Sequence, residues 1–198
     1  KKLSQYADKL SEEVNFLISE EQNGSLSFEH VKSTLAEDSE NEKLYLGEEV
    51  FCDDNIYELI KNKQVLSLNG TNYMLIEFDY FNYCDISDYV YNLKTLGITP
   101  VIAHIERYNY LDVETLLEIK LSGALIQVNA LSVTGESGKK VQKKVLATIK
   151  SGLVDFIATD IHYKRKASLE KAYKIVQKKF GTEVADNLIE KNARIFNI

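Results

Sequence analysis

The sequence lacks several features that would place it in large classes of protein. No apolar run approaches the roughly 20 residues that a membrane-spanning helix needs, and Lys1-Lys2 leads into apolar residues at helical spacing rather than a signal-peptide core. Only two cysteines, Cys52 and Cys84, occur among the 198 residues, and they form no Cys-x-x-Cys pair. We therefore expect a cytoplasmic protein in a reducing compartment, with no disulfide framework, no membrane insertion and both cysteines acting as small buried hydrophobes.

An excess of positive charge is also missing, since the formal net charge is -6 and the sequence pI is about 5.2. A nucleic-acid-binding face needs Lys and Arg side chains to displace counterions from phosphates. We therefore expect no nucleic-acid partner. The local Lys-rich patches at 139–144 and 164–166 fit solvated helix faces, or a rim that attracts an anionic substrate.

The first 42 residues hold no predicted strand. Apolar residues at helical spacing predict a helix over 1–20, and the polar stretch 20–42 predicts a surface connection with a short helix near 30–35 that exposes His30. The chain starts without Met inside this helix, so we expect its first strands to lie upstream of Lys1.

From Lys43 onward, strands and helices alternate with short links, which is typical of a parallel sheet surrounded by helices in a single domain. The predicted strands cover Lys43–Phe51, Gln64–Leu68, Asn72–Phe78, Pro100–His104, Leu125–Asn129 and Val154–Thr159, with an Asn69-Gly70 hairpin turn between the second and third. The predicted helices cover Asn55–Lys61, Ile86–Leu96, Val113–Ser122, Lys139–Ser151, Ala167–Phe180 and Thr182–Lys191. Gly97, Gly123 and Gly152 stand where helix C-caps are expected.

Polar residues lie at or near the carboxyl ends of different predicted strands: Glu49, Glu77, His104, Asn129 and Asp160. The sheet could be open or closed into a barrel, and closure would bring these residues to one rim, where parallel α/β folds place their chemistry. Carboxylates and imidazoles together suit divalent metals such as Mn, Fe or Zn, and two or three such ions could hold a phosphoryl group.

Each candidate also has an ordinary structural interpretation. Glu77 could form an internal salt bridge, and His104 alone could be a core or capping residue. Glu48 and Glu49 point to opposite faces of a strand, so only one of them can face the rim, and we favour Glu49. Arg107 follows His104 closely and could contact a phosphate through two hydrogen bonds.

A set of short motifs resembles one known family. The motifs are Gly47-x-Glu49, Leu75-Ile-Glu-Phe78, His104-x-Glu-Arg-Tyr108, Gln127-Val-Asn129 with Ser132-Val-Thr-Gly135, and Asp160-x-His162. In this order and spacing, the stretch from about Leu44 to Phe180 resembles the polymerase-and-histidinol-phosphatase (PHP) superfamily. Within that superfamily it is most similar to the manganese-dependent protein-tyrosine phosphatases of bacterial capsular and exopolysaccharide loci.

The resemblance implies a distorted β/α barrel that hydrolyses phosphotyrosine with a metal-activated water and without a covalent cysteine intermediate. It implies a cluster of two or three divalent ions, Mn²⁺ with Fe or Zn as alternatives, in the complete family site. It assigns metal ligation to Glu49, Glu77, His104, Asp160 and His162. It assigns substrate-phosphate binding to Arg107 and counts Arg107, Asp160 and His162 as catalytic. The implied partner is a bacterial tyrosine kinase that carries the phosphotyrosines and controls polysaccharide synthesis.

The sequence also departs from the family pattern. The family begins with a strand that carries His-x-His, followed by an Asp and another His, and none of these occurs here; Ile105 replaces the usual Pro. We therefore expect this chain on its own to be poorly active or inactive. A PHP-type phosphatase for small molecules such as histidinol phosphate, and a non-catalytic PHP relic that binds a partner, are the alternative functions.

Overall fold

The computed structural model describes residues 45–161 and 168–195. The helix predicted over 1–20, the connection over 20–42 with His30, and the candidate ligand His162 lie outside the described residues. Within those ranges, none of the helices has the length and apolar character needed to cross a bilayer.

The described part of the chain is built on a parallel sheet of five strands, as the alternating pattern predicts. The strands are β1 (Glu49–Phe51), β2 (Tyr73–Glu77), β3 (Thr99–Ile102), β4 (Leu125–Asn129) and β5 (Phe156–Ala158). Each strand pairs with the next one along the chain, so the spatial order is β1-β2-β3-β4-β5. All five carboxyl ends therefore point the same way, and residues that follow the strands gather at one edge.

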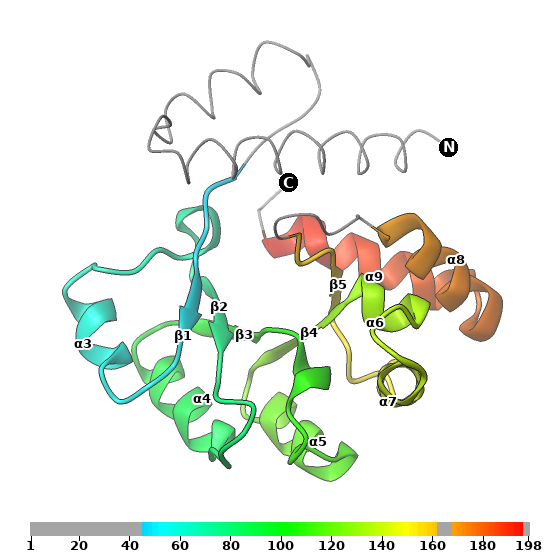
Figure 1. Cartoon of the computed structure of the whole chain (residues 1–198). Coiled ribbons are helices and arrows are strands. Elements are labelled where there is room, and N and C mark those ends of the chain that lie inside the picture. Colours follow the sequence, from blue (N-terminus) through cyan, green and yellow to red (C-terminus); the bar gives the residue numbers. More distant parts are fainter. Residues whose placement is uncertain (1–44, 162–167, 196–198) are drawn as a thin grey trace, which may run out of the picture.

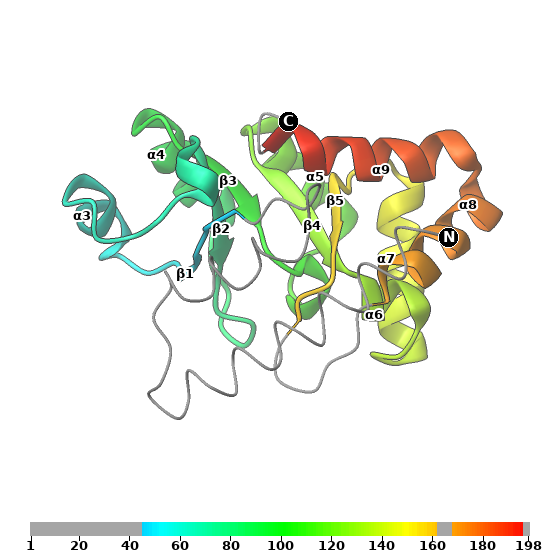
Figure 2. The ribbon, with the colours of Figure 1, turned by 90° about the horizontal axis from the view of Figure 1, so that it is seen from above.

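Helices connect the strands, and Figure 1 shows α3, α4 and α5 together on one side of the sheet. The helices are α3 (Ile56–Lys61), α4 (Ile86–Thr95), α5 (Val113–Leu121), α6 (Ala130–Thr134), α7 (Lys139–Lys150), α8 (Leu169–Phe180) and α9 (Thr182–Ile195). Two 3₁₀ turns, η1 (Leu68–Gly70) and η2 (Ile105–Arg107), lie beside strand ends. The view from above shows α8 and α9 beyond β5 (Figure 2).

The apolar residues of the strands pack against the apolar faces of the helices. Ile76, Ile102 and Ile126 are fully buried and join one core with Leu93 of α4 and Leu116 of α5. Burial of such side chains stabilises the fold by about 1.5–3 kcal/mol each. The core therefore holds the strands, and with them the edge where the polar residues lie, in a fixed register.

The segment 64–68 is not a strand, so the predicted hairpin at Asn69-Gly70 is wrong. Both edges of β2 are already paired in parallel, with β1 on one side and β3 on the other, which leaves no edge for an antiparallel partner. The segment instead bonds to residues that precede β1, because the Leu66 amide donates to Glu48 and the Asn69 amide donates to the Leu46 carbonyl. Asn69 takes a left-handed conformation in η1, with φ 53°.

Most other predicted elements are confirmed, with shifted ends. Gly97, Gly123 and Gly152 have positive φ after helices α4, α5 and α7, as the predicted C-caps require. Strands β1, β3 and β5 are shorter than predicted; β3 ends at Ile102, before the left-handed residue His104, whereas β1 begins only at Glu49. Helix α6 was not predicted, and α9 continues past Lys191 to Ile195.

Candidate metal centre

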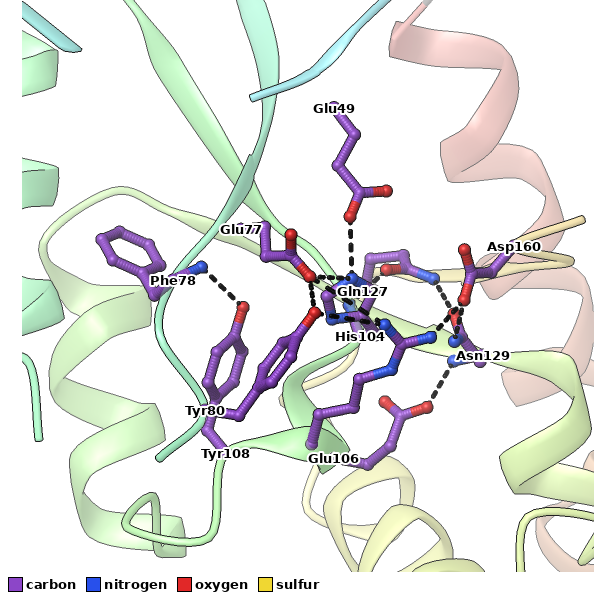
Figure 3. Close-up of polar contacts among 11 residues, drawn as sticks. Glu49, Glu77, Phe78, Tyr80, His104, Glu106, Tyr108, Gln127, Asn129 and Asp160 are labelled. Atoms are coloured by element: carbon purple, nitrogen blue, oxygen red, sulfur yellow. Dashed lines mark hydrogen bonds and ion pairs between the residues drawn. The ribbon is translucent and has the colours of Figure 1, made fainter. Parts of the chain in front are cut away.

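Three predicted ligands converge near the carboxyl ends of their strands: Glu49 lies in the short strand β1, Glu77 ends β2, and His104 follows β3 by two residues (Figure 3). The Nε2 atom of His104 lies 2.9 Å from Oε1 of Glu49 and 3.3 Å from Oε1 of Glu77. One potential ligand atom from each residue lies within 4.8 Å of the others. Three separate strands therefore supply two carboxylate oxygens and one imidazole nitrogen to a single point.

The donor set fits a divalent cation. Burial raises the pKa of Glu77, and the neighbouring Glu49 carboxylate adds to this effect, while His104 and Arg107 oppose it. Gathering two carboxylates in a partly buried site is unfavourable unless a positive charge compensates them. Carboxylate oxygen with imidazole nitrogen is a ligand combination that suits Mn, Fe or Zn. These three residues are therefore fitted to hold a metal ion.

Two of the predicted ligands have strained backbones. His104 has φ 30° and Asp160 has φ 48°, both in the left-handed region, and neither is glycine. Such conformations cost on the order of 1–3 kcal/mol each and persist where surrounding contacts hold them. Both occur directly after strands, where the turn moves the side chain away from the sheet and toward the edge. The strain therefore accompanies the placement of His104 and Asp160 at the site.

Arg107 links the cluster to Asp160. Its Nη2 atom donates to Oδ2 of Asp160 at 2.6 Å, and its Nη1 atom lies 3.9 Å from Oε1 of Glu77. The guanidinium also lies over the ring of Tyr80, 5.8 Å from the ring centre, and Nη1 is 3.5 Å from the Tyr80 hydroxyl. The Tyr80 hydroxyl in turn donates to Glu77. The arginine is therefore held between two carboxylates and an aromatic ring.

Strand β4 contributes amides to the same edge. The side chain of Asn129 donates from Nδ2 to Oδ2 of Asp160 at 2.7 Å and accepts at Oδ1 from Nε2 of Gln127 at 2.8 Å. Gln127 also accepts a hydrogen bond from the backbone amide of His104. Glu106 accepts from the backbone amide of Asn129 at 3.0 Å, and burial raises the pKa of this carboxyl.

A pocket of about 480 Å³ opens beside the cluster. Its lining includes Arg107, Tyr80 and Asn129, which contact the carboxylates of the site, and also Phe81 and Ser132. The Phe81 side chain is 90% exposed. The pocket thus combines a cation, hydroxyl and amide donors, and an accessible aromatic ring next to the candidate metal site.

The structure therefore brings Glu49, Glu77 and His104 together, and places Asp160 beside them through Arg107. Gln127 and Glu106 stand in the sequence motifs but had no predicted role, and Tyr80 was not predicted to lie at this edge. The period of two along a strand gave a signal for Gln127, since it must share a face with Asn129. Tyr80 lies in a loop after β2, where no spacing rule applies.

Together, the fold and the site define a parallel α/β protein with a candidate metal centre at the carboxyl ends of its strands. The model of one protein family, described as "Capsular polysaccharide synthesis, CpsB/CapC", matches residues 13–196. This match covers nearly the whole sequence, so the chain belongs to the CpsB/CapC family.

Similar proteins agree with this assignment. The tyrosine-protein phosphatase CpsB of Streptococcus agalactiae is 34% identical over 178 residues, which cover 85% of this chain and 73% of the relative. The tyrosine-protein phosphatase YwqE of Bacillus subtilis is 30% identical over 149 residues, covering 73% of this chain and 59% of YwqE. A solved structure from a study of YwqE and Streptococcus pneumoniae CpsB, described as metal-dependent tyrosine phosphatases, matches with a TM-score of 0.79. That match has 26% identity and covers 85% of this chain and 70% of the other. The fold expected from the PHP resemblance is thereby confirmed.

Proposed function

We propose that this chain is a metal-dependent phosphatase that removes phosphate from tyrosine in protein substrates. The observation that carries the proposal is the convergence of Glu49, Glu77 and His104 within reach of one cation, with Arg107 beside them. The names of its relatives support the same activity. Asp160 and His162 complete the proposed ligand set, as the family resemblance implies.

The residues of the site have separate proposed roles. A divalent ion, for which we propose Mn²⁺, would polarise the phosphoryl group and supply hydroxide at neutral pH. Arg107 presents five N–H donors in a planar fork, which matches the oxygens of a phosphate. The aromatic ring of the substrate would enter the pocket beside Tyr80 and Phe81. The site thus offers Arg107 to the phosphate group and the pocket to the aromatic ring of a phosphotyrosine.

The cysteines do not have the environment of a phosphatase nucleophile. Burial, with a smaller contribution from Asp85, raises the pKa of the Cys84 thiol to about 11. Burial also raises the pKa of the Cys52 thiol. A nucleophilic cysteine requires the opposite shift, since the thiolate is the reactive form. This supports hydrolysis by activated water rather than through a phosphocysteine intermediate.

The capsule-synthesis family to which the chain belongs supports a proposal for the biological substrate. We propose that the phosphotyrosines are carried by a bacterial tyrosine kinase of the capsule synthesis machinery. A phosphatase in that position would set the phosphorylation level of the kinase and thereby polysaccharide output. The low activity expected for this chain on its own stays a prediction, and the assay below measures it.

The test combines metal binding with turnover. Chelator-treated protein is titrated with Mn²⁺ by calorimetry and then assayed on a phosphotyrosine peptide. Glu77→Gln, which keeps the size but removes the charge of a ligand, should weaken Mn²⁺ binding by at least tenfold and reduce turnover in parallel. Glu58→Gln, on the exposed surface of α3 where Glu58 pairs with Lys61, is the matched control and should change neither.

Two results would contradict the proposal. Turnover that persists unchanged after chelation, with Mn²⁺ affinity unaffected by Glu77→Gln, would remove the metal-site assignment. A strong preference for histidinol phosphate over the phosphotyrosine peptide would leave the reaction type standing but favour the small-molecule alternative.

A further inference from the structure

Strand β4 differs from β1 and β2 in what it supplies to the candidate site. Strands β1 and β2 deliver Glu49 and Glu77, whereas β4 delivers only two amides, Gln127 and Asn129. They are two residues apart, so they share a face of the strand, and they are only 5% and 6% exposed. Buried amides in this position need partners for every donor and acceptor.

The hydrogen bonds of this pair run in one direction. A backbone amide can only donate, so the bond from His104 N requires an oxygen on Gln127. The other end of the Gln127 amide is therefore the NH₂ group, which donates to Oδ1 of Asn129 at 2.8 Å. Asn129 must then present its own NH₂ group to Oδ2 of Asp160, at 2.7 Å. The orientation of both amides thus follows from a single backbone donor rather than from free choice.

We propose that Gln127 and Asn129 are positioning residues whose amides form one directional hydrogen-bond chain from the backbone of His104 to the carboxylate of Asp160. The inference deepens the proposed function, because it concerns two proposed ligands of the same site. These ligands lie at the ends of β3 and β5, one on each side of β4. The chain of amides joins them across the intervening strand (Figure 3).

The surrounding contacts keep this chain in register. The backbone amide of Asn129 is bonded to Glu106, two residues after His104. Asn129 also pairs with Ala158 of β5, two residues before Asp160. The backbone of Asn129 is therefore tied both to the segment that follows His104 and to the strand that precedes Asp160. Groups that orient the ligands of a metal commonly change its affinity by about 10–100-fold when they are removed.

A simpler role for the two amides would be to satisfy buried polar groups independently. The two roles predict different effects of Asn129 on the hydrogen bond of the His104 amide. In the directional chain, loss of Asn129 releases the NH₂ end of Gln127 and thereby weakens the bond to His104, two links away. In the independent case, the His104 amide does not respond to Asn129.

The first experiment needs no metal. Hydrogen exchange of the His104 amide is measured by NMR in metal-free wild type, Asn129→Leu and Gln142→Met. Asn129→Leu should accelerate exchange at His104 about fivefold, the effect of losing part of one hydrogen bond. Gln142, whose side chain donates to the Val133 carbonyl at 2.9 Å, is the control for loss of a partly buried amide and should leave His104 unchanged.

The second experiment is a double-mutant cycle on Mn²⁺ affinity, with Gln127→Met, Asn129→Leu and both together. Each single variant should raise the Kd for Mn²⁺ roughly 10–100-fold. The Kd of the double variant should be no higher than that of the single variant with the higher Kd. The inference would be overturned if the two single losses of Mn²⁺ binding free energy added up in the double variant. It would also be overturned if both single variants kept the wild-type Kd and the wild-type circular dichroism spectrum. Unchanged exchange at His104 in Asn129→Leu would overturn it as well. Wild type that binds no Mn²⁺ while the exchange coupling is present would instead count against the proposed metal function alone.

Discussion

Removing one hydroxyl group from the core should test how the end of β2 is held. Tyr108 is fully buried, and its hydroxyl accepts a hydrogen bond from the backbone amide of Phe78 at 3.0 Å. Phe78 is also fully buried and directly follows Glu77, a proposed ligand. Tyr108→Phe keeps the ring and removes only the acceptor, so the Phe78 amide is left without its partner.

The size of the effect follows from this geometry. Leaving a buried donor unsatisfied costs about 1–3 kcal/mol, and no water can reach an amide in a fully buried residue. For a chain of about 200 residues, each 1 kcal/mol lowers the Tm by about 2–4 °C. We therefore expect Tyr108→Phe to lower the unfolding free energy by about 2 kcal/mol and the Tm by about 4–8 °C.

Urea unfolding followed by circular dichroism measures the difference, with Tyr110→Phe as the control. The Tyr110 hydroxyl donates to the Asp79 carbonyl at 2.9 Å, but Tyr110 is only partly buried. Water can replace this hydroxyl, so Tyr110→Phe should cost less than about 1 kcal/mol. Equal losses in the two variants, or a larger loss in Tyr110→Phe, would refute the argument that Tyr108 holds the end of β2.

Three further predictions concern other parts of the molecule. Phe81→Ala should raise KM for a phosphotyrosine peptide severalfold while KM for an alkyl phosphate stays constant. Tyr83→Ala is the control, because Tyr83 is also an exposed aromatic residue (75% exposed) but does not line the pocket. Asp155→Ala should lower the unfolding free energy by about 3 kcal/mol, because it leaves two Lys side chains and the buried Ile126 amide without their partner, and Mn²⁺ affinity should not change. Since the pKa of Cys84 is raised to about 11, its alkylation by iodoacetamide should stay slow at pH 8 and accelerate toward pH 11; rapid modification at pH 8 would contradict the burial argument.

The arrangement of the strands could be predicted because the signal is local. Helices of about ten residues alternate with short apolar strands, and glycines mark where the helices stop. The hairpin error arose from the same local reasoning. Asn69-Gly70 has the residues of a tight turn, and Asn69 does adopt a left-handed conformation. Only the pairing of β2 with β1 and β3, which is a contact between distant segments, shows that no hairpin can form there.

The candidate site could be predicted in part for a related reason. Parallel strands all end at one edge, so Glu49, Glu77 and His104 could be placed together before their contacts were known. The period of two along a strand does not show which polar residue binds the metal ion and which one positions a ligand. Tyr80 and Gln127 contact the site through a loop conformation and an amide orientation, which depend on the folded neighbours rather than on spacing.

The geometry of Arg107 fits the phosphate-binding role that we propose for it in a strongly acidic site. The guanidinium donates to Asp160 and lies over Tyr80, so its position is set before any phosphate arrives. An arginine has five donors, and these contacts engage only part of them, which leaves N–H groups for phosphate oxygens. Binding therefore does not require the Asp160 contact to break, and little side-chain entropy remains to be lost. A cation held at Glu49, Glu77 and His104 would offset the remaining negative charge, so metal binding and the proposed phosphate binding should reinforce each other.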